Sequence, residues 1–340
     1  MFRRFPAPRR HLKRILLFTT LFVTVIFLIL HLLPPTDQDL ASRQIPHHQD
    51  PQEGTRSDMD LHKTSCYILV MILSTPGNRE NRDILRRNSY LAYPWQYNNA
   101  LVEFRHIFIL GKTGDAGVNL NVTREAEQFR DMAIGNFADS YGTLSIKVTW
   151  GFQYVLKNFN FKFCMKVDED SFVNLSYLSG YLSQVKQEDY QDLYAGKPRQ
   201  GDLAVPKTGR FYAETTGGIE KYVQYNLGGG YILSAPAMRR ILTVHNSHLI
   251  QIIAWEDVYI GTLANMAGLI PTRIYHYYVS RFFPFCTDET SILLHHTPPI
   301  LQAKMLSHYH LTGVYCPKDM EELNVRTLLN SYSIINWNED

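Results

Sequence analysis

From Cys66 onward, short apolar runs alternate with amphipathic ones, and this alternation limits the possible fold more than any other feature of the chain. The run 67–73 is continuously apolar and ends in a Ser-Thr-Pro-Gly-Asn turn, which is typical of a strand buried on both faces. An Arg-rich helix is expected at about 79–90 and a second strand at 105–110. Strands that alternate with helices predict a Rossmann-like α/β fold with a mostly parallel central sheet.

The same reasoning extends through the middle of the chain. Apolar periodicity predicts an amphipathic helix at about 123–140, a third strand at 144–148 and a further helix at 150–159. A short apolar strand at 161–167 then leads into an Asp-Glu-Asp turn at 168–170. Ligands of such sheets bind beyond the carboxyl ends of the strands, so this acidic turn is a candidate binding site.

An uninterrupted apolar run, 15–33, lies beside a basic N-terminus. As a helix it would be about 28 Å long, which is enough to cross a bilayer. Six basic residues and no acid at 1–14 predict a cytoplasmic tail and a single-pass type II membrane protein. A cleaved signal peptide is the alternative, but it usually has a shorter apolar core. The polar run 34–65 predicts a flexible stem before a lumenal domain at 66–340.

Composition excludes several classes of protein. Hydrophobic residues make up 45% of the chain and charged residues 19%, which excludes a disordered or low-complexity chain. Without the six basic residues of the tail, 28 basic residues face 32 acidic ones. A mildly acidic main body is a poor nucleic-acid binder, so no nucleic-acid partner is expected.

Three motifs carry possible chemistry. In the turn 168–170, acids at positions i and i+2 can converge on one divalent cation, for which Mg²⁺ or Mn²⁺ is suited; the alternative is a solvated acidic turn. The glycine run 228–230 before an apolar strand allows a ligand to approach the backbone closely, although a bulge or tight turn would have the same residues. The acid pair 256–257 could be catalytic, or no more than a helix cap.

Taken together and in this order, these motifs resemble the Golgi β-1,3-glycosyltransferases, the family of β-1,3-galactosyl- and β-1,3-N-acetylglucosaminyltransferases. The resemblance covers roughly 66–302, and the family's tail, signal anchor and stem are similar to those expected here. It implies a GT-A glycosyltransferase domain in the lumen of the Golgi, attached to the Golgi membrane. The matching residues are Ser74 to Asn78, Arg82 to Arg86, Phe137 to Tyr141, Asp168 to Asp170, Gly228 to Ser234, Glu256 to Gly261, and Cys286, His295 and Pro299.

The resemblance also implies an activity. It is the inverting, metal-dependent transfer of a sugar from a UDP-sugar to the 3-hydroxyl of an acceptor glycan, on protein or lipid, in β linkage. Asp257 would be the catalytic base, and Asp170, assisted by Asp168, would hold Mn²⁺ (or Mg²⁺). UDP-galactose is favoured as the donor, and UDP-N-acetylglucosamine is the alternative. A non-catalytic Golgi protein of the same fold, which binds a glycan or a client enzyme, is the rival hypothesis.

Further site residues follow from the same resemblance. Glu256 is expected on the acceptor side. Trp255 is expected there as a platform for a sugar ring, with a place in the core as the alternative. The residues expected to contact the donor are Ser74, Arg82, Arg86, Asp139, Asp168, Glu169, Gly229 and Gly230.

Two sequons and several histidines complete the candidate sites. Asn121 begins an Asn-Val-Thr sequon and should be glycosylated in a lumenal domain. Asn174 begins another, but it is expected to cap a helix or to be buried. The pairs His295-His296 and His308-x-His310 could bind zinc, yet no acid or Cys completes a familiar spacing, so zinc is disfavoured.

An oxidising lumen would favour disulfides among the four cysteines. Cys286 and Cys316 are the candidate pair, and Cys66 with Cys316 is the alternative. Cys164 lies within an apolar strand and is expected to be a small buried hydrophobic residue.

Overall fold

The computed structural model has a central sheet of seven strands, in the order β14-β8-β13-β6-β1-β4-β5. The structure describes residues 63–199, 201, 203–204, 221–279 and 290–315. β1 pairs in parallel with β4 and β6, β4 pairs in parallel with β5, and β13 is antiparallel to both of its neighbours. The predicted α/β fold with a mixed, mostly parallel sheet is therefore confirmed. The strands of this sheet are β1 (Thr64–Leu73), β4 (Phe104–Lys112), β5 (Met132–Ala138), β6 (Phe159–Asp168), β8 (Tyr194–Gly196), β13 (Gly230–Ser234) and β14 (Thr272–Arg273).

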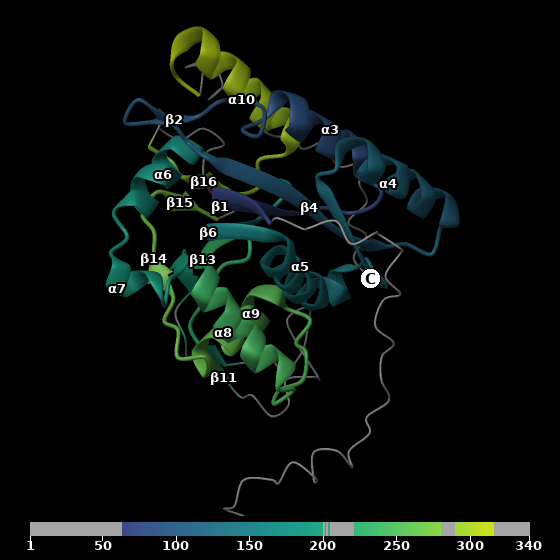
Figure 1. Ribbon diagram of the computed structural model, residues 1–340, viewed down its shortest axis with the longest axis vertical. Coiled ribbons are helices and arrows are strands. Elements are labelled where there is room, and N and C mark those ends of the chain that lie inside the picture. Colours follow the sequence, from purple (N-terminus) through teal and green to yellow (C-terminus); the bar gives the residue numbers. More distant parts are fainter. Residues whose placement is uncertain (1–62, 200, 202, 205–220, 280–289, 316–340) are drawn as a thin grey trace, which may run out of the picture. The chain divides into compact units, whose positions relative to one another are not determined.

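Helices cover both faces of this sheet (Figure 1). Successive residues of β1 point to opposite faces, because side chains alternate along a strand. Ile68, Val70 and Ile72 belong to one apolar core, while Leu69 and Met71 belong to the other. The predicted strand is thus buried on both faces. The first core lies under α3 (Arg79–Asn88), α4 (Ala116–Phe129), α6 (Leu175–Ser183) and α10 (Pro299–Thr312), and the second lies under α5 (Leu144–Asn158), α8 (Ala235–Asn246) and α9 (Glu256–Met266).

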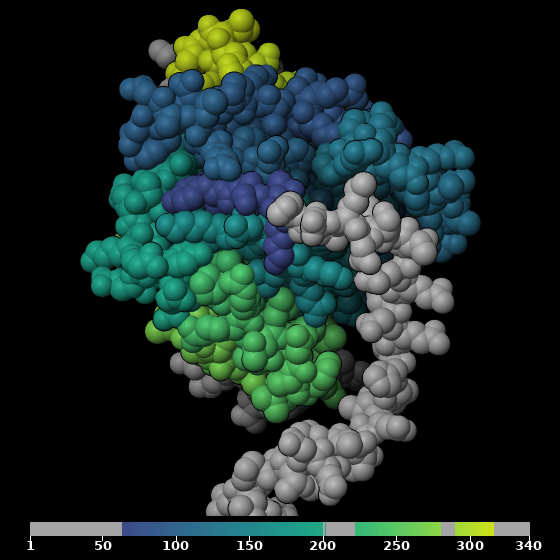
Figure 2. All heavy atoms as spheres, in the orientation of Figure 1, coloured from purple at the N-terminus to yellow at the C-terminus, as the bar shows by residue number. Residues whose placement is uncertain are grey.

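Shorter elements connect these layers. α10 packs against α3 on the first face, and the space-filling view shows its yellow atoms directly against the blue atoms of the N-terminal third of the domain (Figure 2). A small separate sheet has the order β15-β16-β7. The short elements are β2 (Gln96–Tyr97), β3 (Ala100–Leu101), η1 (Tyr141–Thr143), β7 (Phe172–Val173), α7 (Gln187–Tyr190), β9 (Pro198–Arg199), β10 (Leu203–Ala204), β11 (Lys221–Tyr222), β12 (Tyr225–Asn226), β15 (Tyr277–Tyr278) and β16 (Leu293–Leu294).

The helix predicted at 123–140 is wrong in its second half. α4 ends at Phe129, since Arg130 takes the left-handed conformation with φ 55° and closes the helix with a bond from its N–H to the carbonyl of Ala126. The next residues form β5, which pairs with β4 at the edge of the sheet. Apolar residues at helical spacing within 123–140 in fact belong to two elements of different periodicity.

The strand predicted at 144–148 is also wrong, because these residues open α5. Val148, Phe152 and Val155 are spaced four and three residues apart and are fully buried on one face of that helix. The β-branched residues near its start therefore pack as a helical stripe. The helix predicted at 150–159 is confirmed as the remainder of α5.

The N-terminal predictions fall largely outside the described residues. The tail 1–14, the anchor 15–33 and the stem up to residue 62 lie there, and β1 begins at Thr64, just before the expected domain start. In the part of the chain that the structure describes, no helix is both long enough and apolar enough to cross a membrane.

The structure describes two of the four cysteines. Cys164 is 1% exposed in β6 and Cys66 is buried in β1, and both are free thiols, so the buried role of Cys164 is confirmed. Cys286 and Cys316 lie outside the described residues.

Asn174 is 2% exposed and caps α6 by accepting a hydrogen bond from Tyr177 N–H, as expected, whereas Asn121 lies exposed on α4.

Candidate active site

The candidate site lies at the carboxyl edge of the parallel strands. β1 and β6 are neighbours, with Leu73 opposite Asp168, so the turns that follow them lie side by side. The hydroxyl of Ser74 donates a hydrogen bond of 2.7 Å to Oε2 of Glu169, which joins the two turns. This is the edge at which parallel α/β sheets bind their ligands.

Two acids and two histidines meet at this edge. Nε2 of His295 lies 3.3 Å from Oδ1 of Asp170 and 3.7 Å from Oδ2 of Asp168, and Nδ1 of His296 lies 3.7 Å from Oδ2 of Asp170. Ligand atoms of Asp170, His295 and His296 all lie within 4.8 Å of one another. Carboxylate oxygens suit Mg²⁺ and Mn²⁺, and imidazole nitrogens suit transition metals, so this mixed set favours Mn²⁺ over Mg²⁺.

The histidines reach the acids through the small sheet. β7 directly follows the acidic turn and pairs antiparallel with β16, which directly precedes His295. The N–H of Thr297 then donates to the carbonyl of Asp170 over 2.7 Å. The sequence disfavoured zinc at His295-His296, because no acid or Cys completes a familiar spacing. The structure supplies that acid, Asp170, from a distant segment, and no local spacing could have indicated it.

Asp170 and His295 stabilise each other's charged forms. Burial would raise the pKa of Asp170, but hydrogen bonds and charge from His295 and His296 hold it well below its usual range. Burial would lower the pKa of His295, but the neighbouring Asp170 raises it. Without a cation, the carboxylate of Asp170 therefore stays ionised, and its charge favours the protonated form of His295. A metal that binds to His295 has to displace that proton.

The middle residue of the acidic turn points away from this cluster. The carboxylate of Glu169 accepts hydrogen bonds from Ser74, from Asn81 at 3.0 Å and from Asn78. Burial raises the pKa of Glu169, and these three bonds oppose the increase. Its backbone carbonyl also accepts a bond of 3.1 Å from Gln302 on α10. Glu169, expected as a donor contact, fixes the turn to the protein, while the side chains of Asp168 and Asp170 are 32% and 37% exposed.

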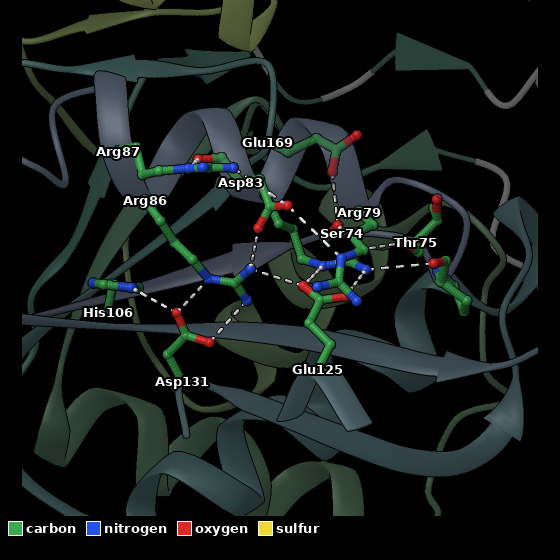
Figure 3. A network of polar contacts seen from close by, with 12 residues as sticks. Ser74, Thr75, Arg79, Asp83, Arg86, Arg87, His106, Glu125, Asp131 and Glu169 are labelled. Carbon is green, nitrogen blue, oxygen red and sulfur yellow. Dashed lines mark hydrogen bonds and ion pairs between the residues drawn. The ribbon is translucent and has the colours of Figure 1, made fainter. Parts of the chain in front are cut away.

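The two arginines expected to contact the donor, Arg82 and Arg86, lie in an interior network. Figure 3 shows Arg86 with its partners Glu125 and Asp131. Arg82 is fully buried, and its guanidinium donates to both oxygens of Glu125 at 2.8 and 2.7 Å. Its remaining N–H groups donate to Ser74 Oγ and to the carbonyls of Thr75 and Pro76. All five N–H groups of Arg82 are therefore used within the protein. Its contact with the candidate site runs through Ser74.

Arg86 lies one helical turn further along α3, away from the carboxyl edge. It donates to both oxygens of Asp131 at 2.7 and 2.9 Å and to Glu125 at 2.8 Å. Asp131 in turn meets His106 at 3.2 Å (Figure 3). The structure thus brings neither arginine to the acids and histidines of the candidate site, and it explains both as interior ion pairs.

Asp139, another expected donor contact, follows β5 at the same edge. Its Oδ2 accepts the N–H of Gly111 at 2.7 Å, and its Oδ1 pairs with the buried Nζ of Lys147 at 2.5 Å. Lys147 also donates to the carbonyl of Ser74 at 3.0 Å. The Asp139 side chain is 3% exposed, and through Lys147 it connects the end of β5 to the Ser74 turn.

The glycine run passes between α9 and the group formed by Asp168, Asp170, His295 and His296. A Cβ at Gly229 would lie 2.5 Å from the ring of His295, and one at Gly230 would lie 2.3 Å from Leu293. A Cβ at Gly228 would lie 3.3 Å from Glu256 on the other side. Glycine is therefore required here because the backbone is in contact with both groups of site residues.

The two acids at the start of α9 differ in exposure: Glu256 is buried and Asp257 is partly exposed. Glu256 is 4% exposed; its carboxylate accepts the hydroxyl of Tyr231 at 2.5 Å and meets Nζ of Lys166 at 3.2 Å. Burial raises the pKa of Glu256 to about 7, with Lys166 opposing the shift. Asp257 is partly exposed, and burial within the site raises its pKa above the ordinary value. Asp257 accepts the N–H of Val258 in the first turn of α9, while Trp255 is the N-cap residue, so a role at the helix end and a role in the site stay open together.

Trp255 is partly buried at the start of α9. Part of its ring packs against the second core, and the ring also meets Tyr141 edge to face, with centroids 5.8 Å apart. Tyr141 is 52% exposed. Two aromatic rings thus flank the start of α9, which is the place expected for an acceptor.

A sequence model of the galactosyltransferase family matches residues 81–274, more than half of the chain. The chain belongs to the galactosyltransferase family. The resemblance inferred from the motifs is confirmed, and so is the expected class of enzyme, a UDP-sugar-dependent β-1,3-hexosyltransferase.

Two curated relatives extend the comparison over most of the chain. A lactosylceramide 1,3-N-acetyl-beta-D-glucosaminyltransferase of Xenopus laevis is 26% identical over 78% of this chain and 69% of its own. Beta-1,3-galactosyltransferase 9 of Homo sapiens is 28% identical over 75% and 70%. Among solved structures, TarS of S. aureus covers 80% of this chain and 44% of its own, with a TM-score of 0.37 and 10% identity. This galactosyltransferase-family chain therefore has relatives named for two different donor sugars.

Proposed function

We propose that this protein is an inverting, metal-dependent β-1,3-glycosyltransferase that transfers galactose from UDP-galactose to the 3-hydroxyl of an acceptor glycan. The observation that carries the proposal is the arrangement around the glycine run. Asp168, Asp170, His295 and His296 lie on one side of it, and Asp257 lies on the other. Such an arrangement suits a donor diphosphate on the first side and an acceptor on the second.

Asp170, His295 and His296, with Asp168 beside them, would hold the cation, and their mixed donors favour Mn²⁺. A bound divalent cation supplies charge neutralisation for a diphosphate leaving group. Asp257 would accept the proton of the acceptor hydroxyl as its oxygen bonds to the anomeric carbon. The bond from that carbon to the diphosphate oxygen breaks on the opposite face, UDP leaves, and an α-linked donor gives a β-linked product.

The choice of donor rests on the family. Its description is galactosyltransferase, and one relative is named as a galactosyltransferase, which supports galactose. The relative from Xenopus laevis is named for N-acetylglucosamine and for lactosylceramide, so N-acetylglucosamine is the second donor to test and a glycolipid is one class of acceptor. With the apolar run 15–33 as anchor, we place the domain in the Golgi lumen as a type II membrane protein.

UDP release by the full-length chain tests the proposal. The assay contains Mn²⁺ and, in parallel, UDP-galactose, UDP-N-acetylglucosamine or UDP-glucose, with protein-linked and lipid-linked acceptor glycans. We expect release with UDP-galactose that requires both the acceptor and the metal. Chelation by EDTA should abolish it, and added Mn²⁺ should restore it better than Mg²⁺. Binding of UDP without release from any donor would instead favour the non-catalytic binding protein.

A further inference from the structure

A buried lysine joins the two sides of the candidate site. Lys166 lies on β6 and is 1% exposed. Its Nζ donates to Oδ1 of Asp168 at 2.9 Å, to the carbonyl of Gly228 at 2.5 Å and to Oε2 of Glu256 at 3.2 Å. These partners come from the acidic turn, the glycine run and the start of α9. One side chain therefore connects the three segments that make the site.

The strand pairing explains this position. Lys166 and Asp168 are two residues apart on β6, so both side chains point to the same face of the sheet. Tyr231 lies opposite Lys166 on β13, and its hydroxyl donates to Glu256. Because α9 covers that face, the lysine and the tyrosine hold the two oxygens of Glu256 from below. The first turn of α9, which carries Asp257, is thereby fixed to the end of β6.

The lysine is fully used by these contacts. An ammonium group has three N–H donors, and three acceptors take one each. Two of these acceptors are carboxylate oxygens, of Asp168 and Glu256, which pair with the ammonium group. Lys166 thus has no N–H left for a phosphate of the donor. Its effect on the reaction has to pass through the residues it holds.

The contact with Asp168 selects one carboxylate oxygen. Lys166 holds Oδ1, which leaves Oδ2 facing Nε2 of His295 at 3.7 Å. A buried ion pair adds little to the stability of the fold, because apolar residues of the same volume often stabilise a protein as well or better. The contact of Lys166 with Asp168 has another possible effect, which is to orient a carboxylate that would bind the metal. Partners behind a ligand commonly govern metal affinity and activity.

We infer that Lys166 is a positioning residue. It holds Asp168, the metal-side carboxylate, at a fixed position relative to Asp257, the base on the acceptor side. The inference rests on the proposed function. It predicts that removal of the lysine weakens metal binding and turnover together, although Lys166 contacts neither substrate.

The test compares E256Q with K166M/E256Q in the full-length chain. Lys166→Met alone would leave the buried carboxylate of Glu256 without a cation, so the double variant, which also neutralises position 256, is the safer one. Both proteins have the same neutral amide side chain at position 256, and their difference reports the lysine itself. Two quantities are measured: Mn²⁺ affinity in the presence of UDP, by calorimetry, and kcat at saturating donor and acceptor.

We expect the double variant to bind Mn²⁺ about 10- to 100-fold more weakly than E256Q. Its kcat should fall by about 100-fold, since a displacement near 1 Å at the reacting groups has that effect. The control is Lys162→Met. Lys162 lies on the same strand but contacts the rings of Tyr67, Phe163 and Tyr190, so its loss should change neither quantity.

Two outcomes would overturn the inference. If K166M/E256Q folds and matches E256Q in Mn²⁺ affinity and kcat, the lysine serves only to neutralise Glu256. If the double variant does not fold, Lys166 belongs to the core of the fold and not to the site. Failure of the proposed function looks different, because wild-type protein would then release no UDP from any UDP-sugar while the calorimetric comparison could still be made.

Discussion

Nε2 of His295 lies 3.3 Å from Oδ1 of Asp170, and this contact joins two segments that are far apart in the chain. The pairing of β16 with β7 brings them together, since one strand precedes the histidine and the other follows the acid. An acidic turn that would otherwise offer only oxygens gains nitrogen donors in this way. The identity of the metal and the strength of its binding should therefore depend on the histidine as much as on the acids.

Replacing His295 by Ala should lower the Mn²⁺-dependent affinity for UDP at least about tenfold, because a donor atom is lost. Asp170→Asn should do the same, because it removes a hard anionic ligand while the fold stays intact. Calorimetric titration of UDP with and without Mn²⁺ measures both. His308→Ala on α10 is the matched control. Normal binding of UDP with Mn²⁺ by the His295 and Asp170 variants would refute the metal assignment.

Asp257→Asn should reduce sugar transfer at least about 100-fold, the usual contribution of a general base. Its affinity for UDP with Mn²⁺ and its melting temperature should stay near the wild-type values, because Asn keeps an oxygen that can accept the N–H of Val258 and residue 257 is not the N-cap. Steady-state kinetics and calorimetry on the same preparation test this. A folded Asp257→Asn variant that binds UDP and still transfers at the wild-type rate would end the assignment.

The rate should also depend on pH through Asp257. Burial raises the pKa of this carboxyl above the ordinary aspartate value, and the base works only when deprotonated. As the pH falls through that raised pKa, kcat should fall with it, at a higher pH than for an exposed aspartate with a pKa of about 4. The profile is recorded with saturating Mn²⁺ at each pH. A kcat that stays constant down to about pH 4 contradicts a buried aspartate as the base.

Arg82→Met should act on stability. It leaves the buried carboxylate of Glu125 with one cation fewer, and breaking such a pair typically costs about 3–5 kcal/mol in the free energy of unfolding. Urea denaturation measures the loss. Arg87→Met, at a side chain that is 71% exposed, should change stability by less than about 0.5 kcal/mol. A stable Arg82→Met protein with a raised KM for the donor would instead favour the nucleotide contact expected from the motif.

The two sequons should behave differently in a secreted or Golgi-targeted chain. Asn121 is exposed on α4 and should carry a glycan if the domain is lumenal. Asn174 is 2% exposed and its side chain caps α6, so it should stay unmodified. Mass spectrometry of the peptides that contain each site measures the difference. Absence of a glycan at Asn121, together with a C-terminus accessible from the cytosol, would contradict the type II topology.

The sequence by itself determined the class of fold and the family. Continuous apolar runs predicted β1, β4 and β6, and the Arg-rich run predicted α3, because burial on both faces of a parallel strand leaves a local pattern. Order along the chain was enough to indicate the family, and the three acids 168, 170 and 257 were named from motifs. Local patterns were insufficient at 123–148, where a helix end, an edge strand and a new helix follow one another within one apolar stretch.

The tertiary structure alone decided which residues meet. Glu169, Arg82 and Arg86 have the charges expected of donor contacts, yet each found a partner inside the protein: Ser74 and the asparagines for the first, Glu125 and Asp131 for the others. His295 joined Asp170, and Lys166 joined Asp168 to Glu256, across segments that share no local pattern. Residue type fixes what a side chain can bind, but a hydrogen bond or ion pair needs a second group within about 3–4 Å. The pairing of distant strands sets that distance.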